Sequence, residues 1–461
     1  MAARSSRGSA TRRRARGFQP LSNTVLGWLV LIFLSLVPLP LGSNRPLFWA
    51  VNAGLVSILG LVFGIAWLAS GEGLRVRMRD IGLLPWAFGA LCVYLLVQIL
   101  PLPGQPFLSD APGATLLMLL RTLTYGVFFF IVLQVSLNPE RAHHLLNMAL
   151  AVLTAHAILA LAMLRSGDTL LGYDKVAYLG SATGTFINRN SFATFLAFGC
   201  VLAFAKLLAD LQHALSERDP YDLDRPWLHV ALAAFAFAAL AGTIVATQSR
   251  MGVAAALVGM LVVAARSIPS VRIARVSAVI VATGVVALVG FVVVLNGGGL
   301  LERLFYTDQS WAERLDLYRQ VVELIGIRPF TGFGGGSFQL AFQQVHQPPL
   351  GVDRVWDKAH NSYLTLLSEL GLVAGLLIPL MLLTIGWMLA RAPGGSARER
   401  LPVTVALGVL AVGASHSLVD FSLEIQAVTL WFVALLSCGL AQALYLATSR
   451  SALDDPDTGS R

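Results

Sequence analysis

The stretch NSFATFLAFGCVLAFAKLL, residues 190–208, carries a single charged side chain, Lys206, in an otherwise almost wholly apolar run. A helix that crosses a bilayer needs roughly 20 mostly apolar residues. This run is long enough to do so, and similar runs recur along most of the chain. Repeated apolar runs of this length predict that the fold is a bundle of helices that span a membrane.

The overall composition points to the same class of protein. Of the 461 residues, 56% are hydrophobic and only 13% are charged, and the mean hydropathy is +0.72. A soluble globule of this size needs a polar exterior and cannot bury so much apolar surface. A lipid bilayer solvates such an exterior. We therefore predict an all-α polytopic membrane protein.

The hydropathy pattern predicts about twelve spanning helices. Two of these segments, 251–266 and 402–418, are short, and 361–390 is long enough to tilt or to protrude from the bilayer. The predicted spans are 24–42, 47–69, 82–100, 115–136, 143–164, 190–208, 228–247, 251–266, 276–295, 361–390, 402–418 and 425–447.

The distribution of basic residues predicts how these spans are oriented. The N-terminal segment RSSRGSATRRRARG, residues 4–17, precedes an apolar run without a small-residue cleavage site, which favours a retained anchor flank over a signal peptide. A basic arm that binds nucleic acid is the alternative, but a membrane segment follows directly. With the N-terminus inside, most Lys and Arg residues fall on the inner side. Both termini are therefore predicted to be cytoplasmic.

This orientation divides the chain into a basic tail (1–23), nine spans (24–295), a long outside loop (296–360), three spans (361–447) and a C-terminal tail (448–461). Within the loop, SWAERLDLYRQVVELIG, residues 310–326, places apolar residues at helical spacing and predicts an amphipathic helix. The apolar residues are Trp311, Leu315, Tyr318, Val322 and Ile325. The segment RPFTGFGGGSF, residues 328–338, follows, and its glycines permit close approach of another backbone.

Four basic side chains gather near the outer face in this topology. Arg189 and Arg250 stand where two spans begin, Arg314 lies on the loop helix, and His360 precedes the tenth span with Asn361 beside it. Guanidinium groups bind phosphate oxygens with forked hydrogen bonds, and helix N-termini add partial positive charge. The cluster therefore suits a pyrophosphate. Each arginine also has a structural interpretation, as a helix cap, an interfacial anchor or an ion-pair partner on the loop helix.

Arg121 lies roughly 10 Å into the fourth predicted span at the helical rise. An isolated charge at that depth is costly, so we expect a partner, for which Glu369 is a candidate, or a place in the wall of a lipid-phosphate site. The sequence shows no Asp-x-Asp pair outside and no Cys/His metal spacing, and Cys92, Cys200 and Cys438 lie in apolar segments. The glycine run also lacks the Gly-Lys-Ser/Thr of a phosphate-binding P-loop. We predict neither a metal site nor a cofactor.

Five segments in this order resemble the O-antigen ligase superfamily, which includes polysaccharide polymerases and O-oligosaccharyltransferases. The resemblance covers roughly residues 180 to 425. The segments are ATGTFINRNSFATFL, TQSRMGVAAALVG, ERLDLYRQVVELIGIRPFTGFGGGSF, KAHNSYLTLLSELGLVAG and SHSLVDFSLEIQ, which begin at residues 182, 247, 313, 358 and 415.

This resemblance implies a metal-independent glycosyltransferase of the bacterial inner membrane with a large periplasmic loop. Its implied donor is a glycan on undecaprenyl pyrophosphate, and in ligases the acceptor is a hydroxyl of lipid A–core. The family's arginines match Arg189, Arg250 and Arg314, and its loop histidine matches His360, where some members have two histidines. We expect His360 to be the catalytic base, and these arginines, Asn361 and Arg121 to contact the donor.

Three other functions remain open at this stage. A polymerase or a protein O-oligosaccharyltransferase would use the same donor with another acceptor. A transporter of an anion or small solute would use the outside cations as a vestibule. Transporters commonly contain structural repeats and place polar, broken helices near the midplane. The sequence shows no repeat, and its candidate residues cluster at one face, so an enzyme is favoured.

Overall fold

The computed structural model describes residues 21–71, 73–101, 107–170, 172–216, 224–267, 308–351, 353 and 355–454. The predicted ninth span, 276–295, lies outside the described residues. So do residues 1–20 of the basic tail, the first part of the predicted loop and residues 455–461.

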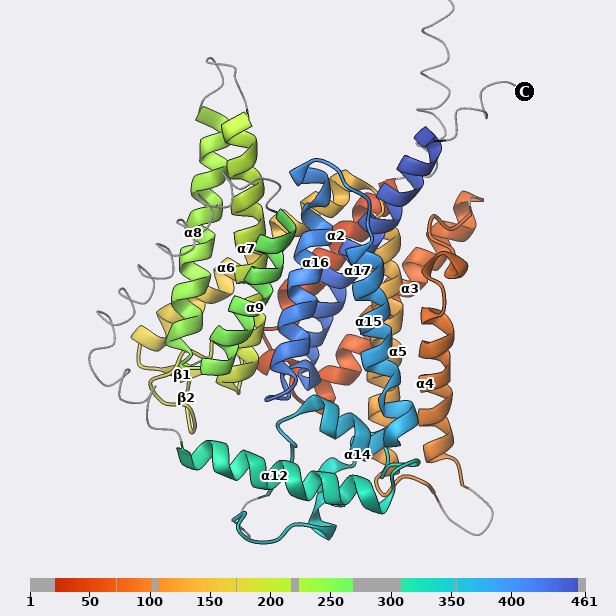
Figure 1. Cartoon of the computed structure of the whole chain (residues 1–461), viewed down its shortest axis with the longest axis vertical. Helices are drawn as coiled ribbons and strands as arrows, with labels where there is room; N and C mark the ends of the chain where they lie inside the picture. The colour runs from red at the N-terminus through yellow and green to blue at the C-terminus, as the bar shows by residue number, and fades with distance from the viewer. Residues whose placement is uncertain are drawn as a thin grey trace, which may run out of the picture.

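The described chain is mostly helical, with one short antiparallel pair of strands (Figure 1). The larger helices are α2 (Leu21–Leu36), α3 (Pro46–Ser70), α4 (Leu84–Ile99), α5 (Pro112–Val135), α6 (Pro139–Arg165), α7 (Arg189–Ser216), α8 (Asp224–Ala246), α9 (Arg250–Ser267), α12 (Asp308–Ile327), α14 (Ser362–Gly375), α15 (Leu377–Ala390), α16 (Ala397–His416) and α17 (Gln426–Asp454). The shorter elements are α13 (Phe338–Ala341), β1 (Thr169–Leu170), β2 (Tyr173–Asp174), η1 (Leu41–Ser43), η2 (Met78–Ile81), η3 (Phe342–Gln344) and η4 (Ser422–Glu424).

Within the described residues, seven helices are long and apolar enough to cross a membrane, and an eighth crossing is possible if the bent pair α14–α15 counts as one span. The seven are α3, α5, α6, α7, α8, α9 and α17. Helices α2 and α4 are apolar but shorter. The chain is thus an all-α, multi-pass membrane protein, and the predicted number of twelve spans stays a prediction.

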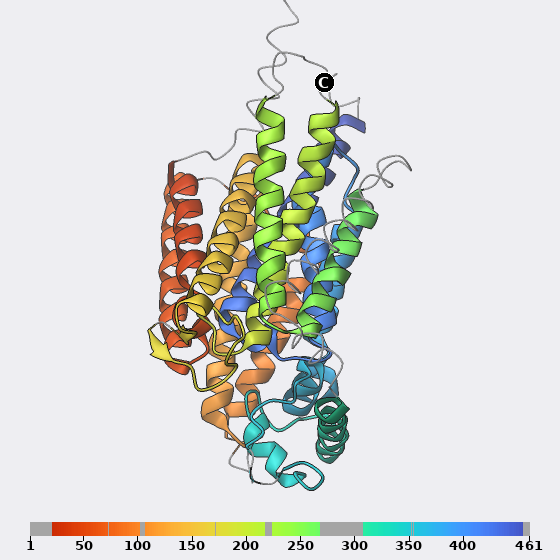
Figure 2. The same ribbon diagram turned by 90° about the vertical axis from the view of Figure 1, so that its left-hand side faces the viewer.

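Helices α7 and α17 form the centre of the bundle. In the most apolar stretch of each, 89% and 83% of the residues are buried inside the protein, against 17% for α3 and 28% for α5. Large apolar side chains such as Leu61 and Leu68 of α3 are instead exposed on the outside. An exposed apolar surface of this kind is suited to contact with lipid rather than with water. Helix α16 packs against both α9 and α17 beside this centre (Figures 1 and 2).

The predicted span 361–390 is two helices, α14 and α15, which meet at an angle of 73°. A second departure from a straight helix occurs at Gly371, whose φ of +74° is open mainly to glycine. A Cβ at this position would lie 2.2 Å from the carbonyl oxygen of Phe330, in the long loop. The glycine therefore lets the backbone of the loop press directly against the start of the span.

The structure has the predicted loop helix as α12, but the prediction of its apolar stripe was only partly right. The buried residues of α12 include Leu317, Val321 and Leu324, which pack with loop side chains in a small separate core. Trp311, Leu315 and Val322 are exposed. The sequence contains apolar residues on both sides of this helix, so spacing alone could not identify the buried face.

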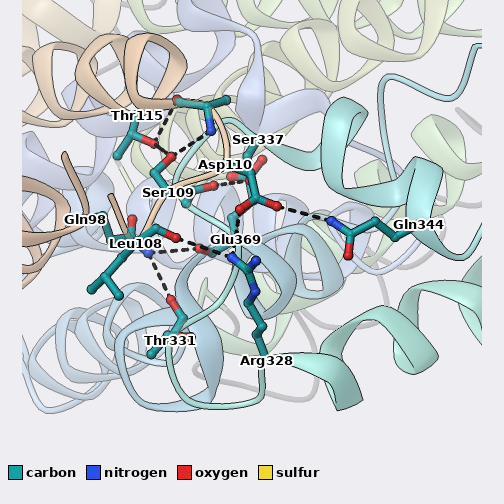
Figure 3. A network of polar contacts seen from close by, with 12 residues as sticks. Gln98, Leu108, Ser109, Asp110, Thr115, Arg328, Thr331, Ser337, Gln344 and Glu369 are labelled. Carbon is teal, nitrogen blue, oxygen red and sulfur yellow. Dashed lines mark hydrogen bonds and ion pairs between the residues drawn. The ribbon is translucent and has the colours of Figure 1, made fainter. Parts of the chain in front are cut away.

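The glycine-rich segment 328–338 joins the loop to the bundle through a network of polar contacts (Figure 3). Gln98 of α4 donates to the carbonyl oxygens of Thr331 and Glu369 at 3.0 and 3.1 Å and accepts from the amide of Gly335. The carboxylate of Glu369 accepts from the amide of Phe338 at 3.1 Å. Arg328 pairs with Asp110 at 2.8 Å. The close backbone approach predicted for these glycines is thus confirmed, and it is a structural anchor.

Candidate functional site at one end of the bundle

Helices α7, α9 and α14 begin, and α16 ends, near the side of the bundle that α12 crosses (Figure 1). Arg189 and Arg250 are the first residues of α7 and α9, and Asn361 is the N-cap of α14. The starts of α7, α9 and α14 add partial positive charge from their first amides, and the end of α16 adds partial negative charge from its last carbonyl groups. The fold therefore collects polar groups from segments that are distant in the sequence.

The start of α7, with Arg189 as its first residue, packs against the start of α9, with Arg250 as its first residue. A Cβ at Gly252 would lie 2.5 Å from the Cβ of Ala193, which leaves room only for glycine. Arg189 donates to Ser181 at 3.3 Å, and its guanidinium lies 5.5 Å from the ring centre of Tyr178. The loop before α7 also contacts the residues before Arg250, through Gln248, which donates to the carbonyl of Gly180 at 3.1 Å.

Arg314 connects the loop helix to the segment after α16. Its guanidinium donates to the carbonyl oxygen of Val419 at 2.9 Å. Of the two carboxylates beside it on the loop helix, Glu313 and Asp316, the second pairs with the exposed Arg319 at 2.9 Å. One turn further along α12, the hydroxyl of Tyr318 donates to the carbonyl oxygen of His360 at 2.9 Å. Helix α12 thus holds both segments in place.

His360 lies in a tight corner of the chain, with a φ of +50° that is uncommon for a residue other than glycine. Its ring packs edge-on against Phe421 at 5.0 Å. Within the described part of the chain its Nδ1 is buried and has no hydrogen-bond partner. Burial lowers the pKa of His360, while the charge of Asp420 raises it and that of Arg314 lowers it. The imidazole therefore favours its neutral form.

Asp420 is the residue that our sequence analysis missed. It is 1% exposed, and its carboxylate accepts from Asn190 of α7 at 3.0 Å and from Ser422 at 2.5 Å. Its charge acts on His360 and on Tyr178. A single Asp within SHSLVDFSLEIQ gave no spacing pattern, and the only available signal was a carboxylate between two apolar helices.

His416 lies behind Asp420 at the end of α16. Its Nδ1 is 2.5 Å from the hydroxyl oxygen of Thr194 on α7 and 3.5 Å from that of Ser422. The side chain is 2% exposed. Together with the bond from Asn190 to Asp420, these contacts join the end of α16 to the first turns of α7.

Tyr178 shows that charges from four segments share one neighbourhood. Burial raises its pKa, and the nearby charges of Arg189 and Arg314 lower it while those of Asp420 and Asp357 raise it. These residues belong to the start of α7, to α12, to the segment after α16 and to the segment before α14. No group of three or more His, Cys, Asp or Glu side chains that could hold a metal ion occurs among the residues described.

Arg121 and Asn361 are held by contacts that serve the structure. Arg121 stacks on Trp49 at 4.4 Å and donates to the hydroxyl of Tyr125 at 3.2 Å and to the carbonyl oxygen of Glu424. The candidate partner Glu369 instead accepts from Phe338, so this pairing was wrong. The side-chain oxygen of Asn361 accepts from the amides of Tyr363 and Leu364 and caps α14.

Near Arg121, Glu424 also binds the loop directly. Its carboxylate pairs with Lys358 at 2.8 Å and accepts from Ser362 at 3.4 Å. The segment 420–424 therefore contacts the loop and the start of α14 through Glu424, and it contacts α7 through Asp420. It joins the segments that form the site.

The fold and the site define a multi-pass α-helical membrane protein with a buried carboxylate, a histidine and several arginines at one end of its bundle. Residues 235–379 match a family described as O-antigen ligase. The match confirms the predicted resemblance to the O-antigen ligase superfamily, and it supports a membrane glycosyltransferase of the ligase or polymerase type. No curated protein matches the chain.

The family match covers only part of the candidate site. Arg250, Arg314, His360 and Asn361 fall within it. Arg189 and Asp420 lie outside it, before and after the matched segment, and they join the site through the contacts of α7 and of the chain after α16.

Proposed function

We propose that this chain is a metal-independent glycosyltransferase that moves a glycan from a polyprenyl pyrophosphate to an acceptor hydroxyl. The observation that carries the proposal is that contacts bring Arg189, Arg314, His360 and Asp420 together from four separate segments. Arg314 donates to the carbonyl oxygen before Asp420, the neighbour of Arg189 donates to the carboxylate of Asp420, and the ring of His360 packs on the residue after Asp420. The family match supports the class of reaction. The donor and the residue roles are our inference from the chemistry of these groups.

The arginines suit the donor's pyrophosphate. As the bond between the anomeric carbon and the pyrophosphate oxygen breaks, negative charge grows on that oxygen. Arg189 and Arg250 at adjacent helix starts, with Arg314 on the loop helix, would stabilise this charge without rearrangement. Preorganised cations of this kind commonly provide the largest part of catalysis.

His360 suits the role of general base. The acceptor oxygen forms a bond to the anomeric carbon and must lose its proton, and a neutral imidazole can accept it. Burial of His360 lowers its pKa, so the base form is present at neutral pH. Asp420 would stabilise the imidazolium that results. Polyprenyl pyrophosphate then leaves with its charge on the arginines.

We further propose that the acceptor is lipid A–core, that the protein lies in the bacterial inner membrane and that the site is periplasmic with both termini cytoplasmic. A polymerase or a protein O-oligosaccharyltransferase shares the donor and differs in the acceptor. Deletion of the protein followed by analysis of envelope glycans separates the three. Loss of long chains from lipid A–core with free polymer accumulating indicates a ligase. Single-repeat chains indicate a polymerase, and unmodified protein acceptor indicates protein glycosylation.

The catalytic assignment is tested by His360→Ala, with His346→Ala as the matched control in the same loop. We expect the first variant to lose glycan transfer at normal expression and normal levels of the polyprenyl-linked donor. The control should retain transfer. Normal transfer by His360→Ala would reject the base role.

Transport of an anion is the alternative of another class. Accumulation of a radiolabelled anion in proteoliposomes that contain the purified protein, without any glycan transfer, would replace the enzymatic proposal.

A further inference from the structure

A shallow pocket opens between α7, α9 and α16, which pack against one another. Its polar lining consists of Gln212 of α7, Arg266 and Ser267 of α9, and Arg400 and Thr404 of α16. The candidate site uses the first residues of α7 and α9, whereas this pocket uses their last turns. The two sites are therefore at opposite ends of the same helices.

The distance between the two sites corresponds to the thickness of a bilayer. Arg250 and Arg266 are the first and nearly the last residues of α9, which places them about 24 Å apart at 1.5 Å per residue. The hydrocarbon core of a bilayer is about 30 Å thick. If Arg250 lies at the level of the head groups on one side, Arg266 lies close to the head groups on the other.

The pocket is positively charged. Arg266 and Arg400 both line it, and no carboxylate does so among the residues that the structure describes. Asp210, two residues before Gln212 on α7, does not line the pocket and pairs with Lys206 at 3.1 Å. A site with two guanidinium groups and hydroxyl donors favours a phosphate oxygen over a neutral ligand.

Arg400 carries an unused donor in this pocket. Its Nε is buried and has no hydrogen-bond partner within the described ranges. A buried donor without a partner costs about 1–3 kcal/mol and calls for an acceptor that enters the pocket. Arg266 makes one long bond, at 3.4 Å to the carbonyl oxygen of Ala392. Both guanidinium groups therefore have capacity for a further acceptor.

The shape of the pocket limits how a ligand can enter. The empty space of the pocket is about 270 Å³, which includes space open to the surroundings. A phosphate would insert one oxygen between the arginines and leave the rest of the molecule at the open mouth.

We propose that this pocket is a second anion site that binds the phosphate group of an anionic membrane lipid. Basic pockets between membrane helices on the cytoplasmic side commonly hold such head groups. The inference is independent of the glycosyltransferase proposal, because it uses none of the residues of that site. Free phosphate offers the same chemistry, and the experiment separates the two sources.

The test compares full-length protein in nanodiscs of phosphatidylcholine alone and of phosphatidylcholine with phosphatidylglycerol. For the wild type, we expect phosphatidylglycerol to raise the unfolding temperature by a few degrees, because a ligand that binds only the folded state stabilises it. Arg266→Gln/Arg400→Gln should lose this rise and bind the lipid about tenfold more weakly. Arg398→Gln removes the same charge from an exposed position on α16 and is the matched control. It should behave as the wild type does.

Inorganic phosphate, added to the phosphatidylcholine nanodiscs, forms the second arm. A stabilisation by phosphate that depends on Arg266 and Arg400, without an added effect of phosphatidylglycerol, assigns the site to a free anion and overturns the lipid assignment. An equal response of the double variant and of Arg398→Gln to phosphatidylglycerol overturns the site itself. If the double variant does not fold, the single variants Arg266→Gln and Arg400→Gln take its place, and each should weaken binding.

Discussion

The guanidinium of Arg314 and the carboxylate of Asp420 are linked through the backbone: Arg314 donates to the carbonyl oxygen of Val419 at 2.9 Å, one residue before Asp420. The charges of both residues act on His360, in opposite directions. The loop helix α12 is therefore positioned by the same segment that carries the buried carboxylate. This contact joins α12 to the segment after α16, in addition to the role that we propose for Arg314 at the donor.

Arg314→Ala should lower glycan transfer by about 10²–10³-fold, the effect typical of removing one group that stabilises developing negative charge. Arg319→Ala is the control, because Arg319 lies on the same helix and its side chain is 75% exposed. We expect it to keep near-normal transfer. The measurement is transfer from a polyprenyl-linked glycan by purified protein at equal amounts of folded protein. Equal activities of the two variants would remove Arg314 from the site.

The pH dependence of transfer tests the charges around His360. Because burial lowers the pKa of His360 below its ordinary value of 6.5, the acid limb of kcat/KM should have its midpoint below 6.5. Asp420→Asn removes a charge that raises this pKa and should move the midpoint to lower pH. Arg314→Gln removes a charge that lowers it and should move the midpoint to higher pH. The residual activity of each variant is measured over roughly pH 4.5 to 8. The midpoints of the two profiles should shift in opposite directions. Shifts of the same sign would contradict this arrangement.

Much of this architecture follows from hydropathy and from helix termini. Apart from 361–390, which is two helices, each predicted span among the described residues corresponds to one helix. Arg189 and Arg250 stand at helix starts, as their place before apolar runs suggested. Hydropathy and helix starts are local features, so the sequence of one segment is enough to predict them. The loop helix was equally visible from its periodicity.

Features that depend on contact between distant segments were not predictable. The bend between α14 and α15 and the left-handed Gly371 lie in a run that hydropathy treats as one span. Asp420 becomes part of the site only because Asn190 of α7 binds it. Glu369 and Arg121 are at similar depth in their predicted spans, yet each is satisfied by a backbone group elsewhere. Depth along a helix does not reveal on which face a side chain lies.

Replacement of Glu369 separates its structural contact from a charge role. Glu369 is 5% exposed, and its Oε1 accepts from the amide of Phe338. Glu369→Gln keeps an acceptor oxygen and should leave the unfolding temperature and transfer nearly unchanged. Glu369→Ala leaves a buried amide without a partner, which costs about 1–3 kcal/mol, and also leaves a cavity. Thermal unfolding in detergent measures both variants. A severe loss of transfer by a normally stable Glu369→Gln would show that the charge itself is required.

Gly371 should be essential for the junction between the loop and the bundle, although it contacts none of the candidate site residues. In Gly371→Ala the residue would keep a φ of +74° that costs of order 1–3 kcal/mol, and its Cβ would meet the carbonyl oxygen of Phe330 at 2.2 Å. The atoms nearest to this Cβ belong to the backbone of Phe330 and Gly332, which cannot move as a side chain can. We therefore expect loss of folded protein and, with it, loss of glycan transfer. Gly326→Ala, in the exposed part of α12, meets nothing within 4 Å and should be neutral or up to about 1 kcal/mol stabilising. The yield of monodisperse protein and its unfolding temperature compare the two. A Gly371→Ala variant as stable as Gly326→Ala would mean that the loop does not press against α14 in the membrane. The position of His360, eleven residues earlier in the sequence, would then not be fixed by this junction.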